Sequence, residues 1–243
     1  MTYYVTRGHI RLMVTNRVTS SSDDEVAAPV GRRERRRQET SEKLFIAAME
    51  LFSSKGFAHT KVEDITQRAD VGKGTFFNYF PSKEHVLGYL VSKQRGTVER
   101  HLVLAREGKM RSEEVLTSLA RDLIRVPSKS PHLARSILTA FLGNIEVREY
   151  MVREISSGRQ LIADILRLGQ ERGELLNKVA PAELARVFQQ ALFGTLLLWS
   201  LDSESSLERQ VSATMRMFLA GSSPSPARRE VRVKAAKRER KAR

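Results

Sequence analysis

The sequence predicts an all-α fold, with a small three-helix unit followed by a larger helical unit. Apolar residues recur at spacings of three and four between residues 32 and 220, and no run shows the period of two that marks a strand. Gly56, Pro181 and Gly221 stand where these patterns stop or begin, as expected at helix ends. Hydrophobic residues make up 41% of the 243 residues, which is enough to bury a core.

The elements follow in chain order. Leu44, Ala48 and Phe52 form one apolar stripe that ends at Gly56. Further helices are expected at about residues 112–126, 131–142, 145–171, 181–201 and 204–220. We therefore expect an N-terminal extension at 1–31 and a small helical domain at 32–95. A larger domain at 96–220 and a tail at 221–243 follow, and composition predicts that both end segments are disordered.

The charge is concentrated in two places. The chain carries a formal net charge of +14, with a pI of about 10.4. Residues 31–95 hold 13 basic and 8 acidic side chains, and residues 221–243 hold 9 and 2, whereas residues 96–220 are close to neutral. A balance this basic predicts an anionic partner, either nucleic acid or an acidic membrane surface.

Residues 59–83 carry the most specific local pattern, HTKVEDITQRADVGKGTFFNYFPSK. Thr60 and Glu63 have the spacing of a capping box, which predicts a helix from about Lys61. Asp70-Val71-Gly72 breaks that helix, and a second short helix runs to Pro81. Two short helices joined by a tight turn are the helix-turn-helix arrangement that places its second helix in a DNA groove.

The stretch from about Glu39 to Tyr89 resembles the N-terminal domain of the TetR family of bacterial regulators. The matching segments are LFSSKGF, VEDITQRA, DVGKGTFFNYF and PSKEHVL, in that order. The resemblance implies an N-terminal three-helix helix-turn-helix DNA-binding domain and a C-terminal helical domain for ligand binding and dimerisation. Gly72 stands where the family commonly has a capping Ser, and Phe77 stands where it commonly has a Tyr that contacts phosphate.

The resemblance also implies which residues contact DNA. Thr60 would contact a phosphate, Lys73, Gly74, Thr75 and Phe76 would face the major groove, and Tyr79 and Lys83 would hold the DNA backbone. Phe77 could contact a thymine methyl group instead of phosphate. The complete predicted set is Thr60, Lys61, Lys73, Gly74, Thr75, Phe76, Phe77, Asn78, Tyr79 and Lys83.

Phe76 has a second interpretation, because its position on the short helix also suits an inward anchor together with Phe80. Two interpretations remain open for the arginines at 32, 33, 35, 36 and 37 as well: a solvated charge run, or an arm just before the first helix that follows DNA. The C-terminal basic run from Arg228 to Arg243 is expected to strengthen salt-sensitive, non-specific DNA binding.

The last two predicted helices are too apolar for the surface of a monomer. We expect them to form a four-helix interface with a second copy. The predicted interface residues are Phe188, Leu192, Leu196, Trp199, Leu207, Val211 and Met215. The alternative is that these residues only close the core of one chain.

Together these features predict a homodimeric repressor that binds a palindromic operator in double-stranded DNA and is released by a small apolar effector. The alternative is an architectural, nucleoid-type DNA binder that uses its basic tails and has no effector. A cytoplasmic location is expected, and no membrane partner, because the longest apolar stretch, near Ala191–Leu201, is about half of the roughly 20 residues that a spanning helix needs.

The sequence predicts no enzyme, no metal site and no cofactor. It contains no cysteine, and none of its five histidines pairs at metal-ligand spacing. The ligand-binding residues are not identified by the pattern. One or two of six polar or aromatic residues on the apolar helices are candidates for lining a cavity: His132, Asn144, Gln160, Gln189, Gln190 and Trp199.

Overall fold

The computed structural model describes residues 5–6, 9–10, 31–143 and 145–222. They form two compact units that divide after Tyr89, on the same helix as the boundary predicted after residue 95. Two short strands, β1 (Val5–Thr6) and β2 (His9–Ile10), pair in antiparallel register. Most of the predicted N-terminal extension and residues 223–243 lie outside the described residues.

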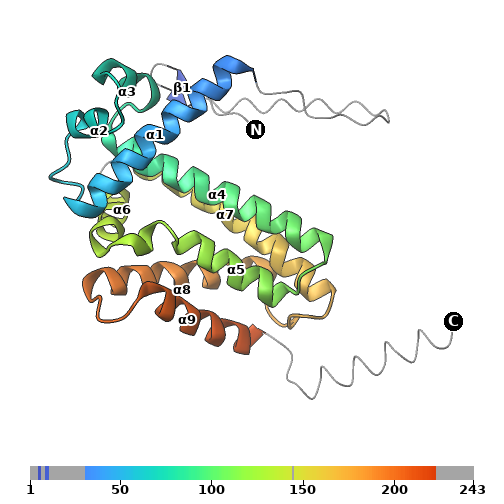
Figure 1. The fold of residues 1–243 in the computed structure, drawn as a ribbon. Helices are drawn as coiled ribbons and strands as arrows, with labels where there is room; N and C mark the ends of the chain where they lie inside the picture. The colour runs from blue at the N-terminus through green and yellow to red at the C-terminus, as the bar shows by residue number, and fades with distance from the viewer. Residues whose placement is uncertain (1–4, 7–8, 11–30, 144, 223–243) are drawn as a thin grey trace, which may run out of the picture. The chain divides into compact units, whose positions relative to one another are not determined.

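The N-terminal unit contains α1 (Arg32–Ser54), α2 (Val62–Arg68), α3 (Lys73–Tyr79) and the start of α4 (Lys83–Glu107) (Figure 1). Helix α1 stops where the sequence predicts, because Gly56 adopts the left-handed backbone conformation, with φ of +80°, that ends many helices. The three helices of the predicted domain are therefore confirmed.

Apolar side chains from all of these helices make the core of the unit. Leu44, Ala48 and Phe52 of α1 are fully buried, as their spacing predicts, and so is Ile65 of α2, which packs against α1. Removing a side chain of this size from a closed core commonly costs several kcal/mol. The position of the two short helices therefore depends on α1.

The start of α2 differs by one residue from the prediction. Lys61, not Thr60, is the N-cap residue, and its backbone N–H donates to the carboxylate of Asp64 at 3.0 Å. That bond lowers the pKa of Asp64, since it favours the charged carboxylate. The Thr60 hydroxyl donates instead to the carbonyl oxygen of Gly56 at 2.8 Å and ties α2 to the end of α1.

The C-terminal unit is helical throughout its described length. Beyond α4 it contains α5 (Ser112–Ile124), the 3-10 turn η1 (Pro127–Lys129), α6 (Pro131–Gly143), α7 (Ile145–Glu171), α8 (Pro181–Leu201) and α9 (Leu207–Ser222). These bounds agree with the five predicted helices to within three residues at each end. Helix α8 packs against α6, α7 and α9, and α5 packs against α7 and α9.

Helix α8 lies at the centre of this packing. Its 21 residues are long and apolar enough to cross a membrane by length and composition alone. Its buried side chains, however, belong to the main hydrophobic core of the unit, together with residues of α4, α5, α7 and α9. The inner side of α8 is therefore part of the core.

Candidate nucleic-acid interface

Helix α3 is held in place by its aromatic side chains. Phe76 is fully buried, and its ring lies 5.8 Å from that of Phe80, which in turn lies 5.7 Å from that of Tyr89. Such contacts between rings add to the stabilisation from burial. Gly72 at the N-cap makes no side-chain cap hydrogen bond, as predicted, so α3 depends on these rings for its position.

The turn before α3 fixes where the helix begins. Asp70 adopts a left-handed conformation, with φ of +53°, which aspartate tolerates better than most residues. The next backbone N–H, that of Val71, donates to the carbonyl oxygen of Thr66 at 3.0 Å and closes the end of α2. The tight turn predicted from Asp70-Val71-Gly72 is thus confirmed.

The opposite face of α3 points to solvent. Lys73, Gly74, Phe77 and Asn78 are exposed, and Phe77 keeps 48% of its surface accessible. Thr75 and Tyr79 are half-buried at the edges of this face. A methyl group added at Gly74 would meet no atom within 4 Å, so the fold of the chain does not require glycine there.

Three predicted contact residues are placed differently. Phe76 lies inside, which favours the anchoring interpretation over a groove contact. Thr60 is 1% exposed, and its hydroxyl is already bonded to Gly56. The ammonium group of Lys83 donates to the carbonyl oxygens of Phe57 and Thr60 at 2.8 and 3.0 Å. These three residues support the surface that the others form.

The charges beside α3 are arranged in pairs. Lys73 donates a hydrogen bond to the carboxylate of Glu63 on α2, and this bond lowers the pKa of Glu63. Both side chains are more than half exposed, so water and salt screen the pair. Lys73 can therefore exchange Glu63 for a phosphate at little cost. Lys61, at the start of α2, is also exposed.

The arginine run belongs to α1 itself and not to an arm before it. Arg32 is the first residue of the helix, so the five arginines occupy its first two turns. The guanidinium of Arg37 lies 5.9 Å from the ring centroid of Tyr79 and places this basic turn beside the end of α3. Arg33 and Arg36 are exposed there. Positive side chains at a helix N-terminus are unfavourable electrostatically, which an anionic partner would offset.

The residues predicted to form a dimer interface lie in the core of one chain. Phe188, Leu192, Leu196, Trp199, Leu207, Val211 and Met215 are all at most 8% exposed. That part of the prediction is wrong, and the alternative interpretation holds for these residues. The same two helices expose a different set on their other faces, with 44–75% of each surface accessible: Val187, Leu197, Leu198, Leu201 and Met217.

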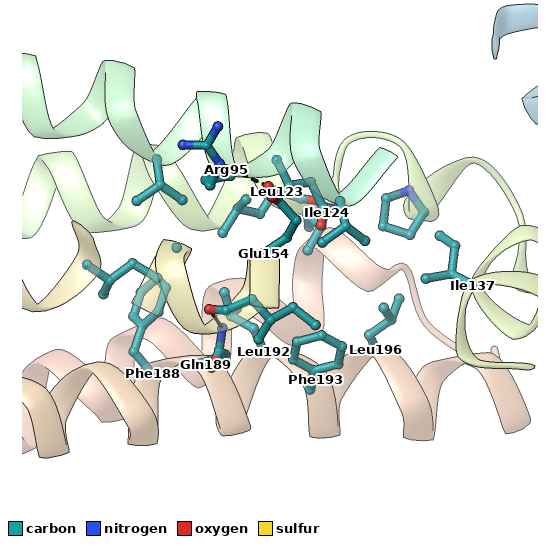
Figure 2. Close-up of a pocket in the computed structure, with 17 residues that line it drawn as sticks. Arg95, Leu123, Ile124, Ile137, Glu154, Phe188, Gln189, Leu192, Phe193 and Leu196 are labelled. Carbon is teal, nitrogen blue, oxygen red and sulfur yellow. Dashed lines mark hydrogen bonds and ion pairs between the residues drawn. The ribbon is translucent and has the colours of Figure 1, made fainter. Parts of the chain in front are cut away.

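A cavity of about 100 Å³ lies within the C-terminal unit (Figure 2). Side chains from α4, α5, η1, α6, α7 and α8 line it, and most are apolar, among them Val98, Ile124 and Leu196. Gln189 is among the lining residues, as the candidate set from the sequence anticipated. The sequence did not single out Arg95 and Glu154, which form an ion pair in the wall.

Within the described part of the chain, no three His, Cys, Asp or Glu side chains gather closely enough to hold a metal ion. The described residues form a helix-turn-helix surface with basic flanks and, in a separate helical unit, an apolar cavity. Together these features define a DNA-binding transcriptional regulator of the helix-turn-helix class.

Comparison with known proteins gives the family. Residues 44–90 match the model of the bacterial regulatory proteins of the tetR family. The uncharacterized HTH-type transcriptional regulator YvkB of Bacillus subtilis is 26% identical over 164 residues, which cover 64% of this chain and 80% of YvkB. The HTH-type transcriptional repressor KstR of Mycobacterium tuberculosis is 23% identical over 181 residues, 73% of this chain and 75% of KstR. Residues 44–90 thus match the TetR family of transcriptional regulators, and the similarity to YvkB and KstR, both HTH-type transcriptional regulators, extends over most of the chain.

Solved structures share the fold over most of the chain. FadR from Bacillus subtilis in complex with stearoyl-CoA superposes with a TM-score of 0.59 at 21% identity, and covers 74% of this chain and 98% of its own. FadR from Thermus thermophilus in complex with lauroyl-CoA gives 0.56 at 28% identity, over 74% and 93% of the two chains. Both resemblances extend through the C-terminal unit, where the family sequence pattern is absent.

Proposed function

We propose that this chain is a homodimeric repressor that binds a palindromic operator through α3 and leaves it when a small molecule enters the C-terminal unit. The observation that carries the proposal is the exposed face of α3, which has hydrogen-bond donors, one exposed aromatic ring and a glycine with free space around it. Location in the cytoplasm, where the operator lies, is part of the same proposal.

The proposed DNA-binding residues fall into groups according to the part of the DNA that they contact. Lys73, Gly74 and Thr75 are expected to approach base edges, and Phe77 a thymine methyl group. Lys61, Asn78 and Tyr79 are expected to contact the phosphate backbone, which sets register and affinity. Thr60, Phe76 and Lys83 act indirectly, by holding the ends of α2 and α3.

Dimerisation is assigned to the exposed face of α8 and α9. Val187, Gly194, Leu197 and Leu201 recur at spacings of three, four and seven, which places them on one side of α8. Exposed leucines in such a row are unusual on a monomer and typical of an interface. Met217 extends the face onto α9, which packs directly beside α8.

Dimerisation has a direct test. Leu198→Glu combined with Leu201→Glu should convert dimers to monomers in sedimentation velocity experiments, because each dimer would bury four added charges. Val103→Glu is the matched control, since Val103 is a comparably exposed residue on α4. It should leave the dimer intact. A double variant that sediments as a dimer would contradict this assignment.

The cavity is the proposed effector site. The two FadR proteins hold acyl-CoA ligands, which supports a ligand-responsive role for the related helical unit here. Helix α4 lines the cavity with Gln94 and Arg95 and continues without a break back to Lys83. A ligand that prefers one position of α4 would therefore shift the population of DNA-binding states.

The test of the whole proposal is an operator-retention experiment with the full chain. The palindromes flanking its gene are mixed with the protein in gel-shift titrations, with a scrambled duplex as control. Selective retention of one palindrome at moderate salt supports the repressor. No retention even at low salt would refute it.

The basic C-terminal run favours one second candidate, an architectural DNA binder without an effector. Removing residues 223–243 separates the two proposals. A repressor keeps its preference for the palindrome over the scrambled duplex and loses affinity for both, because the tail would supply salt-dependent phosphate contacts alone. An architectural binder would lose most of its binding and show no preference before or after the deletion.

A further inference from the structure

The polar side chains in the cavity wall indicate the chemistry of the ligand. Among mostly apolar lining residues, four side chains are polar: Gln94, Arg95, Glu154 and Gln189. Few polar groups in an apolar pocket normally determine which ligand is bound and in which orientation. The hydrogen-bonding positions that these side chains leave unoccupied therefore indicate which chemical groups a ligand carries.

Arg95 is already engaged by carboxylates. Its Nε donates to Glu154 Oε2 at 2.9 Å, and its Nη1 donates to Glu99 Oε1. The Arg95 and Glu154 side chains are 8% and 9% exposed, while Glu99 lies outside the lining at 39%. Two carboxylates around one guanidinium leave this corner with a net negative charge.

Glu154 has bonding capacity left on the cavity side. One of its oxygens accepts from Arg95, and no donor among the described residues contacts the other, Oε1. A carboxylate oxygen buried without a donor is unfavourable, and the penalty is larger for a charged group than for a neutral one. Figure 2 shows Glu154 between Arg95 and the α8 residues Gln189 and Leu192.

Each of the two glutamines leaves its amide oxygen and one of its two amide N–H groups for a ligand. The Gln94 amide nitrogen donates to the carbonyl oxygen of Leu123 at 3.1 Å, and that of Gln189 donates to the carbonyl oxygen of Ile155 at 3.2 Å. A backbone carbonyl can only accept, so these bonds fix which end of each amide is nitrogen. Within the described residues, neither glutamine oxygen receives a hydrogen bond.

We propose that the cavity selects a ligand with an apolar body and a hydrogen-bond donor, with a protonated amine preferred over a neutral hydroxyl and a carboxylate excluded. The donor binds Glu154 Oε1, and the apolar part lies against Phe188, Leu192 and Leu196. An anionic group would meet the excess carboxylate charge of Glu154 and Glu99 around Arg95. This inference rests on the effector site of the proposed function and specifies its chemistry.

The size of the cavity sets the scale of the probes. Its volume of about 100 Å³ is smaller than the roughly 150 Å³ cavity that holds one benzene molecule. Short, flexible chains are therefore suitable. We choose n-propylamine, n-propanol and propanoate, which have fewer heavy atoms than benzene, share one apolar chain and differ in the charge of the head group.

Calorimetric titration of each probe into the full-length protein, without DNA, tests the proposal. Trp199 is the single tryptophan of the chain and lies one turn from Leu196, so its fluorescence gives a second readout. Propylamine should bind at least about tenfold more tightly than propanoate, with propanol between them, since hydrogen bonds to charged groups are the stronger ones. The net charge of +14 works in the opposite direction, so general attraction cannot produce this order.

Glu154→Gln should reduce the amine-to-alcohol preference to within about threefold, because the amide still accepts from Arg95 but carries no charge. Glu99→Gln removes the same charge from the other side of Arg95, outside the lining, and should retain most of the preference. The ranking on the unmodified chain stands without either variant if one of them fails to fold.

Equal or tighter binding of propanoate, binding of none of the three probes, or a preference that survives Glu154→Gln would each overturn the proposal. Operator retention without ligand is measured on the same preparation. A failure there counts against the repressor, whereas a failure of the probe ranking counts only against the ligand class.

Discussion

Gly74→Ala separates the stability of the chain from its affinity for DNA. The glycine lies inside α3 on its exposed face, and an added Cβ would meet no atom within 4 Å. Alanine is favoured over glycine in a helix interior by about 1 kcal/mol. The free protein should therefore gain up to that amount, a rise of roughly 2–4 °C in Tm for a chain of this size.

The same substitution should weaken operator binding. A glycine that the fold does not require, on the face proposed to enter the groove, indicates that the helix backbone approaches DNA closely there. A methyl group at that point separates the two surfaces at both half-sites. The loss expected for a disrupted base contact is about 1–3 kcal/mol per site, or tenfold or more in Kd.

Thermal unfolding by circular dichroism gives the first quantity, and fluorescence anisotropy of a labelled operator at fixed salt gives the second. Gly96→Ala on α4 is the matched control, because its added Cβ would meet only the Arg100 guanidinium, at 4.0 Å. It should raise Tm and leave Kd unchanged. If Gly74→Ala also left Kd unchanged, the proposed approach of α3 to DNA would be wrong.

Three further predictions concern the same unit. Replacing Arg33 and Arg36 with Gln should weaken all DNA binding. It should also reduce the dependence of log Kd on log salt by about one for each phosphate that the protein no longer neutralises. An unchanged salt dependence would indicate that the arginine turn is only a solvated charge run. Asp64→Ala should lower the free energy of unfolding by removing the hydrogen bond that caps α2, measured by urea denaturation, and an unchanged free energy would refute the cap. Lys73→Met should raise the pKa of Glu63 toward its ordinary value of 4.5, followed by NMR. Because folding lowers the pKa of Glu63, its hydrogen bond to Lys73 stabilises the fold at pH values above 4.5 and weakens as the pH falls through the folded pKa. An identical titration of Glu63 in both proteins would exclude Lys73 as the cause.

The sequence was sufficient for the end of α1 and for helices α5 to α9 because local signals mark them, but it missed the start of α1 and the extent of α4. Pro181 begins α8 and the positive φ of Gly56 ends α1, and both properties belong to the residue types themselves. The cap of α2 was predicted one residue early because Thr60-Glu63 and Lys61-Asp64 have the same spacing. Only the hydrogen bonds of Thr60 to Gly56 and of Lys61 to Asp64 distinguish the two.

The apolar pattern of α8 was insufficient to locate an interface. Phe188, Leu192 and Leu196 form the stronger stripe, and periodicity alone does not reveal whether a stripe meets its own chain or another. The exposed row contains Gly194 and is interrupted by polar neighbours, so it is weaker in sequence. Helix α8 has two apolar faces, and only the packing of the other helices identifies the inner one.

The cavity residues were hidden for a different reason. Arg95 and Glu154 are 59 positions apart and belong to different helices, so no local pattern links them. Each resembles an ordinary charged residue of an amphipathic helix when it is considered alone. Gln189 could be suspected from the sequence because it is a polar residue in a strongly apolar helix.

The two sides of α8 are free to change independently. Substitutions at Leu198 or Leu201 touch no part of the core, whereas substitutions at Phe188 or Leu192 leave the outward row intact. Since we propose the outward row as the dimer interface, gene duplication followed by drift on that side alone would yield sister chains with the same interior and different dimerisation partners. Several such regulators could then share one cell without forming mixed pairs.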